Sequence, residues 1–304
     1  MVIPAHKVSD TLDETLDALA NQTVPAVQVV IVLDGHDPEL ERIARAHPIG
    51  ATILVEPACS GGPSRPRNLG NDLLRSDLDL VWFLDGDDIP APSFIEVLGG
   101  VMLDNPGAWL VTSDFNRWYA NGPVPEPNEP PSDPRVREIP LQQYCDNTGS
   151  MVPSFTLWRR SYFSKIRTDG TPFDPGNLCN EDFESFVRVL HLGRVLEVDW
   201  IGGNYRIHRD SHSGNALRAW TWRMEACNSL SKWFKRRQER RLSKRFKKAG
   251  LRVSGRISRL IYEEGRRGEA IRRLRRQAWR HQDLRSLLLM GGMIFHLAPA
   301  RLHR

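Results

Sequence analysis

The sequence predicts an α/β fold, with a mixed, mainly parallel sheet flanked by helices and a basic helical extension after it. Short apolar runs alternate with amphipathic segments over residues 1–90, as they do in chains of βα units. Several of these runs end in polar or acidic turns. Beyond residue 230, Lys and Arg accumulate on segments with helical patterning. We therefore expect a first domain over residues 1–215 and a helical extension over residues 216–304.

The elements follow from periodicity and from Gly and Pro breaks. Leu12, Leu16 and Leu19 recur at the spacing of one helical face, and Ser9 or Asp10 precedes them as a candidate cap. Strands are expected at residues 2–3, 27–33, 51–55, 80–84 and 154–158, and helices at 38–47, 66–76 and 181–192. Residues 121–140 and 202–214 are expected to form polar loops, and basic helices are expected after residue 220.

The cysteine pattern and the apolar stretches indicate where the protein is located and whether zinc sites or disulfides are expected. The four cysteines form no C-x-x-C pair, so we expect neither a zinc site nor a disulfide framework, and a reducing cytoplasm fits best. No signal peptide is expected, and the apolar stretch at 287–298 is shorter than the roughly 20 residues of a membrane-spanning helix. The expected location is cytoplasmic, with peripheral association at the inner face of a bacterial membrane left open.

Polar side chains follow three of the expected strands: His6 and Lys7, then Asp34, then Asp85 to Asp88. Functional sites of such sheets lie at the carboxyl ends of the strands. The sequence Asp85-Gly86-Asp87-Asp88 crowds three carboxylates, and a divalent cation such as Mn²⁺ or Mg²⁺ would relieve that repulsion. A solvated turn with helix-capping acids is the alternative.

Two further clusters carry polar chemistry. Glu181 and Asp182 lie at an expected helix start, where they either complement the helix dipole or supply a general base. The segment 60–68 sets Arg65 and Arg67 ahead of a helix, an arrangement suited to phosphate but matching neither a Walker loop nor a dinucleotide fingerprint. His208, Asp210 and His212 share a loop, where they either complete a metal shell or are ordinary surface residues.

Together these segments resemble the family 2 glycosyltransferases, which have the GT-A fold. Each motif is weak alone, but six in family order over residues 1–215 make a specific pattern. In order they are Ile3-Pro4-Ala5-His6, Val32-Leu33-Asp34-Gly35, Arg67-Asn68-x-Gly70, Leu84-Asp85-Gly86-Asp87-Asp88, Asn180-Glu181-Asp182 and Tyr205-Arg206-x-His208.

The resemblance implies a role for each matching residue. Asp34 would contact the nucleotide base, Arg67 the base or the phosphates, and Asp85 the ribose. Asp87 would bind the Mn²⁺ or Mg²⁺ that bridges the diphosphate of a nucleotide-sugar donor, and Asp182 would be the general base of an inverting transfer. The remaining residues implied are Pro4, His6 and Glu181 in the nucleotide-sugar site, and His208 or His212 as a metal or diphosphate contact.

A narrower similarity concerns the acceptor. Ser60-Gly61-Gly62-Pro63 leading into Pro66-Arg67-Asn68 looks like the bacterial wall teichoic acid glycosyltransferases, which modify poly(ribitol phosphate). The expected partners are thus a UDP-sugar and a glycan or polyol-phosphate acceptor. The sequence departs from the family at His6-Lys7 and at Leu33, and both departures concern the nucleotide pocket.

Alternative functions use different parts of the chain. A nucleotidyltransferase would need a Gly-rich basic loop near the first strand, and residues 4–12 contain none. A nucleic-acid-binding protein would use the basic tail but would give Asp85, Asp87 and Asp182 no role, so nucleic acid is not an expected partner. The tail itself could bind an anionic membrane, with Trp233, Phe234 and residues 287–298 as apolar anchors; it could hold a polyanionic acceptor; or it could only pack as helices.

Overall fold

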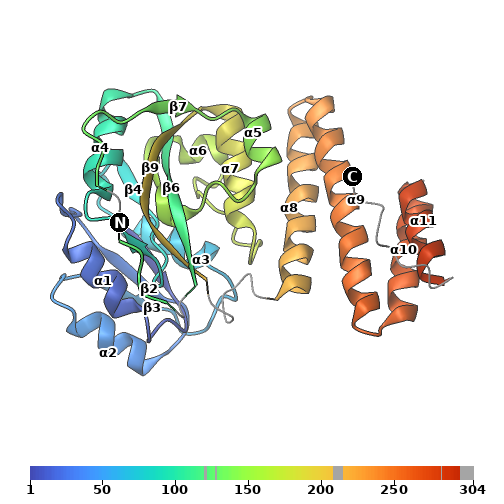
Figure 1. Cartoon of the computed structure of the whole chain (residues 1–304), viewed down its shortest axis with the longest axis horizontal. Helices are drawn as coiled ribbons and strands as arrows, with labels where there is room; N and C mark the ends of the chain where they lie inside the picture. The colour runs from blue at the N-terminus through green and yellow to red at the C-terminus, as the bar shows by residue number, and fades with distance from the viewer. Residues whose placement is uncertain (120–121, 127–128, 208–214, 282, 295–304) are drawn as a thin grey trace. The chain divides into compact units, whose positions relative to one another are not determined.

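The computed structural model describes residues 1–119, 122–126, 129–207, 215–281 and 283–294 (Figure 1). The chain divides into two compact units, Met1–Ser211 and His212–Arg304. We describe each unit by itself.

The first unit begins with a three-stranded parallel sheet in the order β1-β2-β3. Parallel neighbours need crossover connections, and helices provide them here. One of these helices, α2, begins where the Asp37 side chain accepts a hydrogen bond from Leu40 N at 3.1 Å and Pro38 takes the first helical position. The elements are β1 (Val2–Ala5), α1 (Leu12–Ala20), β2 (Val30–Leu33), α2 (Pro38–Ala46), β3 (Thr52–Val55) and α3 (Ser64–Asp72).

A six-stranded mixed sheet continues from the first, joined to it where Val2 pairs in parallel with Phe83. Its order is β4-β8-β6-β9-β5, and β7 pairs with β9. Strands β6 and β9 are long parallel neighbours that run side by side (Figure 1). The strands are β4 (Leu80–Trp82), β5 (Ile89–Pro90), β6 (Ala108–Tyr119), β7 (Val136–Glu138), β8 (Thr156–Arg159) and β9 (Arg194–Ile207). The helices are α4 (Phe94–Asp104), α5 (Leu141–Asp146), α6 (Phe163–Ile166) and α7 (Glu181–Leu192), with short 3₁₀ turns at Pro153–Phe155 and Arg160–Tyr162.

Two of the predicted loops are wrong in part. Residues 202–207 continue β9, and β7 lies within the segment 121–140. The loop prediction rested partly on Gly202 and Gly203, but in the structure these glycines allow neighbouring strands to pack closely. A Cβ on Gly203 would lie 2.5 Å from Ile89 O, and one on Gly202 would lie 2.2 Å from Ser113 Oγ.

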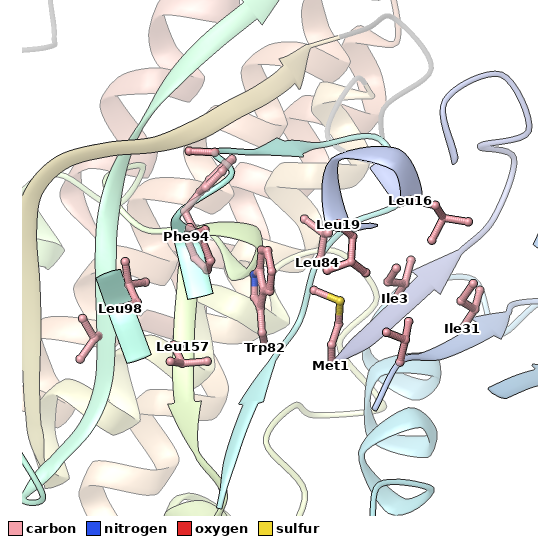
Figure 2. Close-up of a cluster of buried hydrophobic side chains, with 14 of the residues drawn as sticks. Met1, Ile3, Leu16, Leu19, Ile31, Trp82, Leu84, Phe94, Leu98 and Leu157 are labelled. Carbon is pink, nitrogen blue, oxygen red and sulfur yellow. The ribbon is translucent and has the colours of Figure 1, made fainter. Parts of the chain in front are cut away.

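The main core lies between these sheets and the helices that cover them. Met1, Ile3, Leu16, Leu84 and Leu98 are among the apolar side chains that meet there (Figure 2). Trp82 stacks on Phe94 with ring centroids 4.3 Å apart, and Trp82 Nε1 donates to Ser154 O at 2.8 Å. This hydrogen bond satisfies the indole N–H, so Trp82 can be buried without leaving a polar group unpaired.

A second, aromatic cluster fixes the position of α7. Phe186 of α7 stacks on Trp158 of β8, with centroids 5.3 Å apart. Phe173, in the loop before α7, packs edge-on against Phe83 at 5.0 Å and against Trp158 at 5.7 Å. Because Phe83 follows β4 directly, this cluster ties α7 to the strand that leads into Asp85.

The second unit consists of helices α8 (Ala216–Arg236), α9 (Arg240–Glu263), α10 (Arg267–His281) and α11 (Leu284–Ile294). Helices α8 and α9 lie side by side (Figure 1), and Phe234 stacks on Phe246 with centroids 5.3 Å apart. Phe234 is fully buried, so its prediction as a membrane anchor is wrong. Among the described residues, no helix has both the length and the apolar character needed to cross a membrane.

Candidate active site

The turn after β4 holds its three carboxylates in different environments. Asp88 is fully buried and accepts a hydrogen bond from Arg206 N at 2.9 Å. Arg206 Nε also donates to Asp87 O at 2.7 Å, so β9 fixes the turn from the side. The Asp85 and Asp87 side chains remain partly exposed. Asp88 therefore anchors the turn, while the carboxylates of Asp85 and Asp87 remain partly accessible to solvent.

Negative charge is concentrated at this turn. Burial raises the pKa of Asp88 well above its usual range, and the carboxylates of Asp87 and Asp85 raise it further. Tyr205 of β9 is affected in the same direction: burial raises its phenol pKa, and Asp88, Asp85, Asp87 and Asp182 add to the effect. A cation bound near Asp85 and Asp87 would relieve this repulsion.

Arg67 of α3 joins the two acidic clusters that the sequence set far apart. Its side chain is buried; Nη2 donates to Asp85 Oδ1 at 2.5 Å, and Nη1 donates to Glu181 Oε1 at 2.6 Å. Burial opposes the charge on the guanidinium, but Asp85 and Glu181 outweigh burial and raise the pKa of Arg67. Arg67 therefore lies between carboxylates here, and the contact with base or phosphates that the resemblance implies stays a prediction.

The start of α7 divides its acids in the same way as the turn after β4. Glu181 is buried, and burial followed by repulsion from Asp182 raises its pKa to about 7 despite the Arg67 charge. Asp182 is half-buried, and its Oδ1 accepts a hydrogen bond from Phe183 N at 2.6 Å. The start of a helix is a favourable place for negative charge.

The loop before α7 is held by residues that adjoin the Arg67 motif. Asn68 Nδ2 donates to Phe173 O at 2.9 Å, and Phe173 N donates to Asn68 Oδ1 at 3.2 Å. Ser64 Oγ donates to Asn177 O at 2.7 Å. Asn68 and Asn177 are positioning residues that sequence patterns did not reveal, although Asn68 belongs to the motif Arg67-Asn68-x-Gly70.

Gly62 lets this loop approach, and it provides a test. A Cβ at Gly62 would lie 2.5 Å from Leu178 O and 2.7 Å from Leu178 Cα. We expect Gly62→Ala to lower the free energy of unfolding by about 1–3 kcal/mol, as overpacking does, and to reduce turnover by displacing the start of α7. Gly99→Ala is the matched control, because nothing lies within 4 Å of a Cβ there. Chemical denaturation and a transfer assay measure both effects; equal behaviour of the two variants would refute the role of Gly62.

A third polar group lies at the ends of β1 and β2. Asp34 is buried and accepts hydrogen bonds from Ser60 N at 2.7 Å and from the Cys59 thiol at 3.4 Å. His6 Nδ1 lies 3.0 Å from Asp34 O, and the ligand atoms of His6, Asp34 and Cys59 lie within 4.8 Å of one another. Gly35, with a φ of +103°, turns the chain close to Cys59. Cys59 is a further member of this group that sequence patterns did not reveal.

Asp34 and Asp85 lie just after β2 and β4, whereas Arg67 lies in α3 and Glu181 and Asp182 begin α7. Pro4 lies half-buried in β1, where it pairs with Val32 of β2. His208 and His212 lie outside the described residues. Buried Arg67 pairs with Asp85 of the β4 turn and with Glu181, the neighbour of Asp182, so the two acidic clusters lie on either side of one guanidinium.

Residues 1–167, more than half of the chain, match the family described as Glycosyl transferase family 2. The chain belongs to this family. Membership confirms the predicted family and enzyme class, a glycosyltransferase. The family also disfavours the nucleotidyltransferase alternative.

One curated protein and several solved structures are similar to part of the chain. The uncharacterized glycosyltransferase EpsJ of Bacillus subtilis (strain 168) is 28% identical over 99 residues, which are 32% of this chain and 28% of EpsJ. The crystal structure of S. aureus TarS 1-349 in complex with UDP-GlcNAc superimposes with a TM-score of 0.58 at 16% identity, covering 75% of this chain and 65% of that one. The complex of TarS 1-349 with UDP gives 0.56 at 16% identity, covering 75% and 64%.

The chain therefore spans less than two thirds of the length of each of these proteins. At 16% identity the likeness to TarS concerns the fold, and it confirms the predicted α/β class of this family 2 glycosyltransferase.

Proposed function

We propose that this family 2 glycosyltransferase transfers a sugar from a UDP-linked donor, in a metal-dependent and inverting reaction. The proposed acceptor is a hydroxyl group of a surface glycan or a polyol-phosphate polymer. The observation that carries the proposal is the double ion pair of Arg67, which brings the β4 turn and the start of α7 into one site. Two solved structures of similar fold hold UDP or UDP-GlcNAc, which supports a uridine donor.

The donor set of the β4 turn fits Mn²⁺ or Mg²⁺. Asp85 and Asp87 offer carboxylate oxygens on partly exposed side chains, and hard divalent cations bind through one or two carboxylates plus substrate phosphates. Burial is the main cause of the raised pKa of Asp88, and the neighbouring carboxylates of Asp87 and Asp85 raise it further. When bound, such an ion supplies charge stabilisation for the departing diphosphate.

The residues of the chain would divide the remaining tasks. Asp34, held by Ser60 N–H, would bind the base, and Asp85 would contact the ribose. Asp182 would take the proton from the acceptor hydroxyl. The hydroxyl oxygen would bond to the anomeric carbon as the bond between that carbon and the diphosphate breaks. A single displacement of this kind inverts the anomeric centre. Buried Glu181 and Arg67 would position Asp182 and Asp85.

The narrower similarity to wall teichoic acid glycosyltransferases rests on the segment 60–68. In the structure this segment holds the loop before α7 through Ser64, Asn68 and Gly62. It therefore lies next to the start of α7, where the proposed base is located. A polyol-phosphate acceptor is the substrate class that this similarity supports.

Nucleotide-induced stabilisation tests the donor class. Binding to the native state raises the apparent stability by about 2.7 kcal/mol at a ligand concentration 100 times its Kd. We expect UDP with Mn²⁺ to raise the melting temperature by several degrees, and UDP alone or Mn²⁺ alone to have little effect. ADP, GDP and CDP with Mn²⁺ serve as controls. A shift of equal size with every nucleotide, or without metal, would contradict the proposed donor site.

A further inference from the structure

The helical unit contains a pocket that the transfer reaction does not use. Its volume is about 730 Å³, within the range of small-molecule sites, and α8, α9 and α10 line it. The lining includes five cations and one carboxylate, Glu225. The cations are Lys232, Lys247, Arg273, Arg276 and Arg280.

These cations form no ion pairs in the part of the chain that the structure describes, although Arg273 Nη2 donates to Met224 Sδ at 3.3 Å. Among the described residues, none of the five lies within 4.0 Å of a carboxylate oxygen, whereas neighbouring arginines such as Arg259 and Arg266 form such pairs. Like charges gathered in one concavity repel each other and attract an anion. Burial lowers the pKa of Arg273, and the Arg276 charge lowers it further.

Two residues that line the pocket each have a buried polar atom without a hydrogen-bond partner in the part of the chain that the structure describes. Arg273 Nε is a buried donor with no acceptor, and Gln277 Oε1 is a buried acceptor with no donor. The orientation of the Gln277 amide follows from its contacts: Nε2 donates to Leu251 O at 3.0 Å and to Asp283 Oδ2 at 2.9 Å, so the oxygen must face the other way. Each such group costs free energy until a ligand satisfies it.

We propose that this pocket binds a phosphate ester that also carries free hydroxyl groups. The phosphate would accept hydrogen bonds from the Arg273 guanidinium and face Arg276 and Arg280, while a hydroxyl would donate to Gln277 Oε1. Arginine is the side chain best suited to phosphate because its N–H groups match the phosphate oxygens. Such a ligand is either a soluble polyol phosphate or the headgroup of a phospholipid.

Binding to the full chain tests the proposal directly, independently of transfer. Calorimetry at about 0.15 M salt would compare sn-glycerol 3-phosphate with inorganic phosphate. Flotation would compare phosphatidylcholine vesicles containing phosphatidylglycerol with vesicles containing phosphatidylserine, which has the same net charge but no free hydroxyl. If the ligand is a soluble polyol phosphate, we expect glycerol phosphate to bind more tightly than inorganic phosphate. If the ligand is a lipid headgroup, we expect vesicles with phosphatidylglycerol to bind more tightly than vesicles with phosphatidylserine.

Matched variants on α10 locate the site. Arg276→Gln/Arg280→Gln removes two pocket cations, and Arg272→Gln/Arg275→Gln removes two exposed cations of the same helix that do not line the pocket. The first variant should weaken binding about 10-fold or more and the second about twofold or less. Equal loss in both variants would mean general surface charge, and it would overturn the proposal. So would absence of binding by both glycerol phosphate and phosphatidylglycerol, or failure of hydroxyls to improve either ligand.

Arg273→Met separates binding from folding. Because the Arg273 Nε is buried without an acceptor, its removal should leave the melting temperature unchanged or higher while weakening binding about 10-fold or more. A lower melting temperature would show that Arg273 is structural, and it would contradict its assignment as a ligand contact. Each pocket variant should keep the response to UDP and Mn²⁺, which separates failure of this pocket from failure of the proposed donor site.

Discussion

Asp182→Asn is expected to reduce sugar transfer by on the order of 10²-fold or more, with donor binding retained. The inverting reaction needs a carboxylate on the acceptor side of the anomeric carbon. Asp182 is half-buried at the start of α7, where its Oδ1 accepts the Phe183 N–H and where a helix favours negative charge. Asparagine keeps the shape and the hydrogen-bond acceptor but cannot take a proton.

Glu181 is the natural competitor for this role, and the structure argues against it. It is buried, its Oε1 is paired with Arg67, and its pKa is raised to about 7 by burial first and by Asp182 second. Glu181→Gln would leave the Arg67 guanidinium with one carboxylate partner, so it should lower stability as well as activity. Asp182→Asn should lower activity alone.

Turnover with a UDP-sugar and calorimetric titration with UDP measure the two quantities that matter. Asp13→Asn is the matched control, since Asp13 is also an acid in the first turn of a helix but is exposed on α1. Transfer at the wild-type rate in Asp182→Asn would eliminate the proposed base. If Asp182→Asn loses both UDP binding and sugar transfer, Asp182 has a structural role.

Asp87→Ala is expected to abolish the metal dependence of UDP binding, with a loss of affinity of more than about 10-fold in the presence of Mn²⁺. Asp87 presents a partly exposed side chain on the turn after β4, and its backbone carbonyl accepts Arg206 Nε–H. Truncating the side chain leaves that backbone hydrogen bond in place. The protein should therefore remain folded.

Asp88 supplies the contrast within the same turn. Its buried carboxylate accepts Arg206 N–H, so Asp88→Ala should lower the melting temperature whether or not metal is present. Asp104→Ala, at the exposed end of α4, should change neither property. Calorimetry of UDP with and without Mn²⁺ decides the question. Unchanged metal-dependent affinity in Asp87→Ala would exclude Asp87 as a metal ligand.

Local pattern was sufficient for much of the first unit. The apolar run 27–33 predicted a parallel strand, which the structure has at Val30–Leu33, and the helix at 181–192 has the predicted bounds. Asp34, Asp85 and Asp87 could be singled out because residues that directly follow parallel strands meet at one sheet edge. These inferences need only hydrophobic periodicity and strand order, which the sequence contains.

Tertiary structure decided which polar groups are buried and which face an open site. Nothing in Asp85-Gly86-Asp87-Asp88 indicates that Asp88 anchors the turn on β9, because Arg206 is 118 residues away. The Arg67–Glu181 pair spans 114 residues in the same way. Long-range pairing also made residues 202–207 a strand although their composition is typical of a loop.

The helical unit shows the same division. The sequence predicted its basic composition and its helices, but it did not predict which side chains contact one another. Phe234 pairs with Phe246 in the interior, and five cations from α8, α9 and α10 line one pocket. Periodicity assigns residues to faces of one helix, whereas burial and charge clustering depend on which faces meet, and only the packed structure determines that.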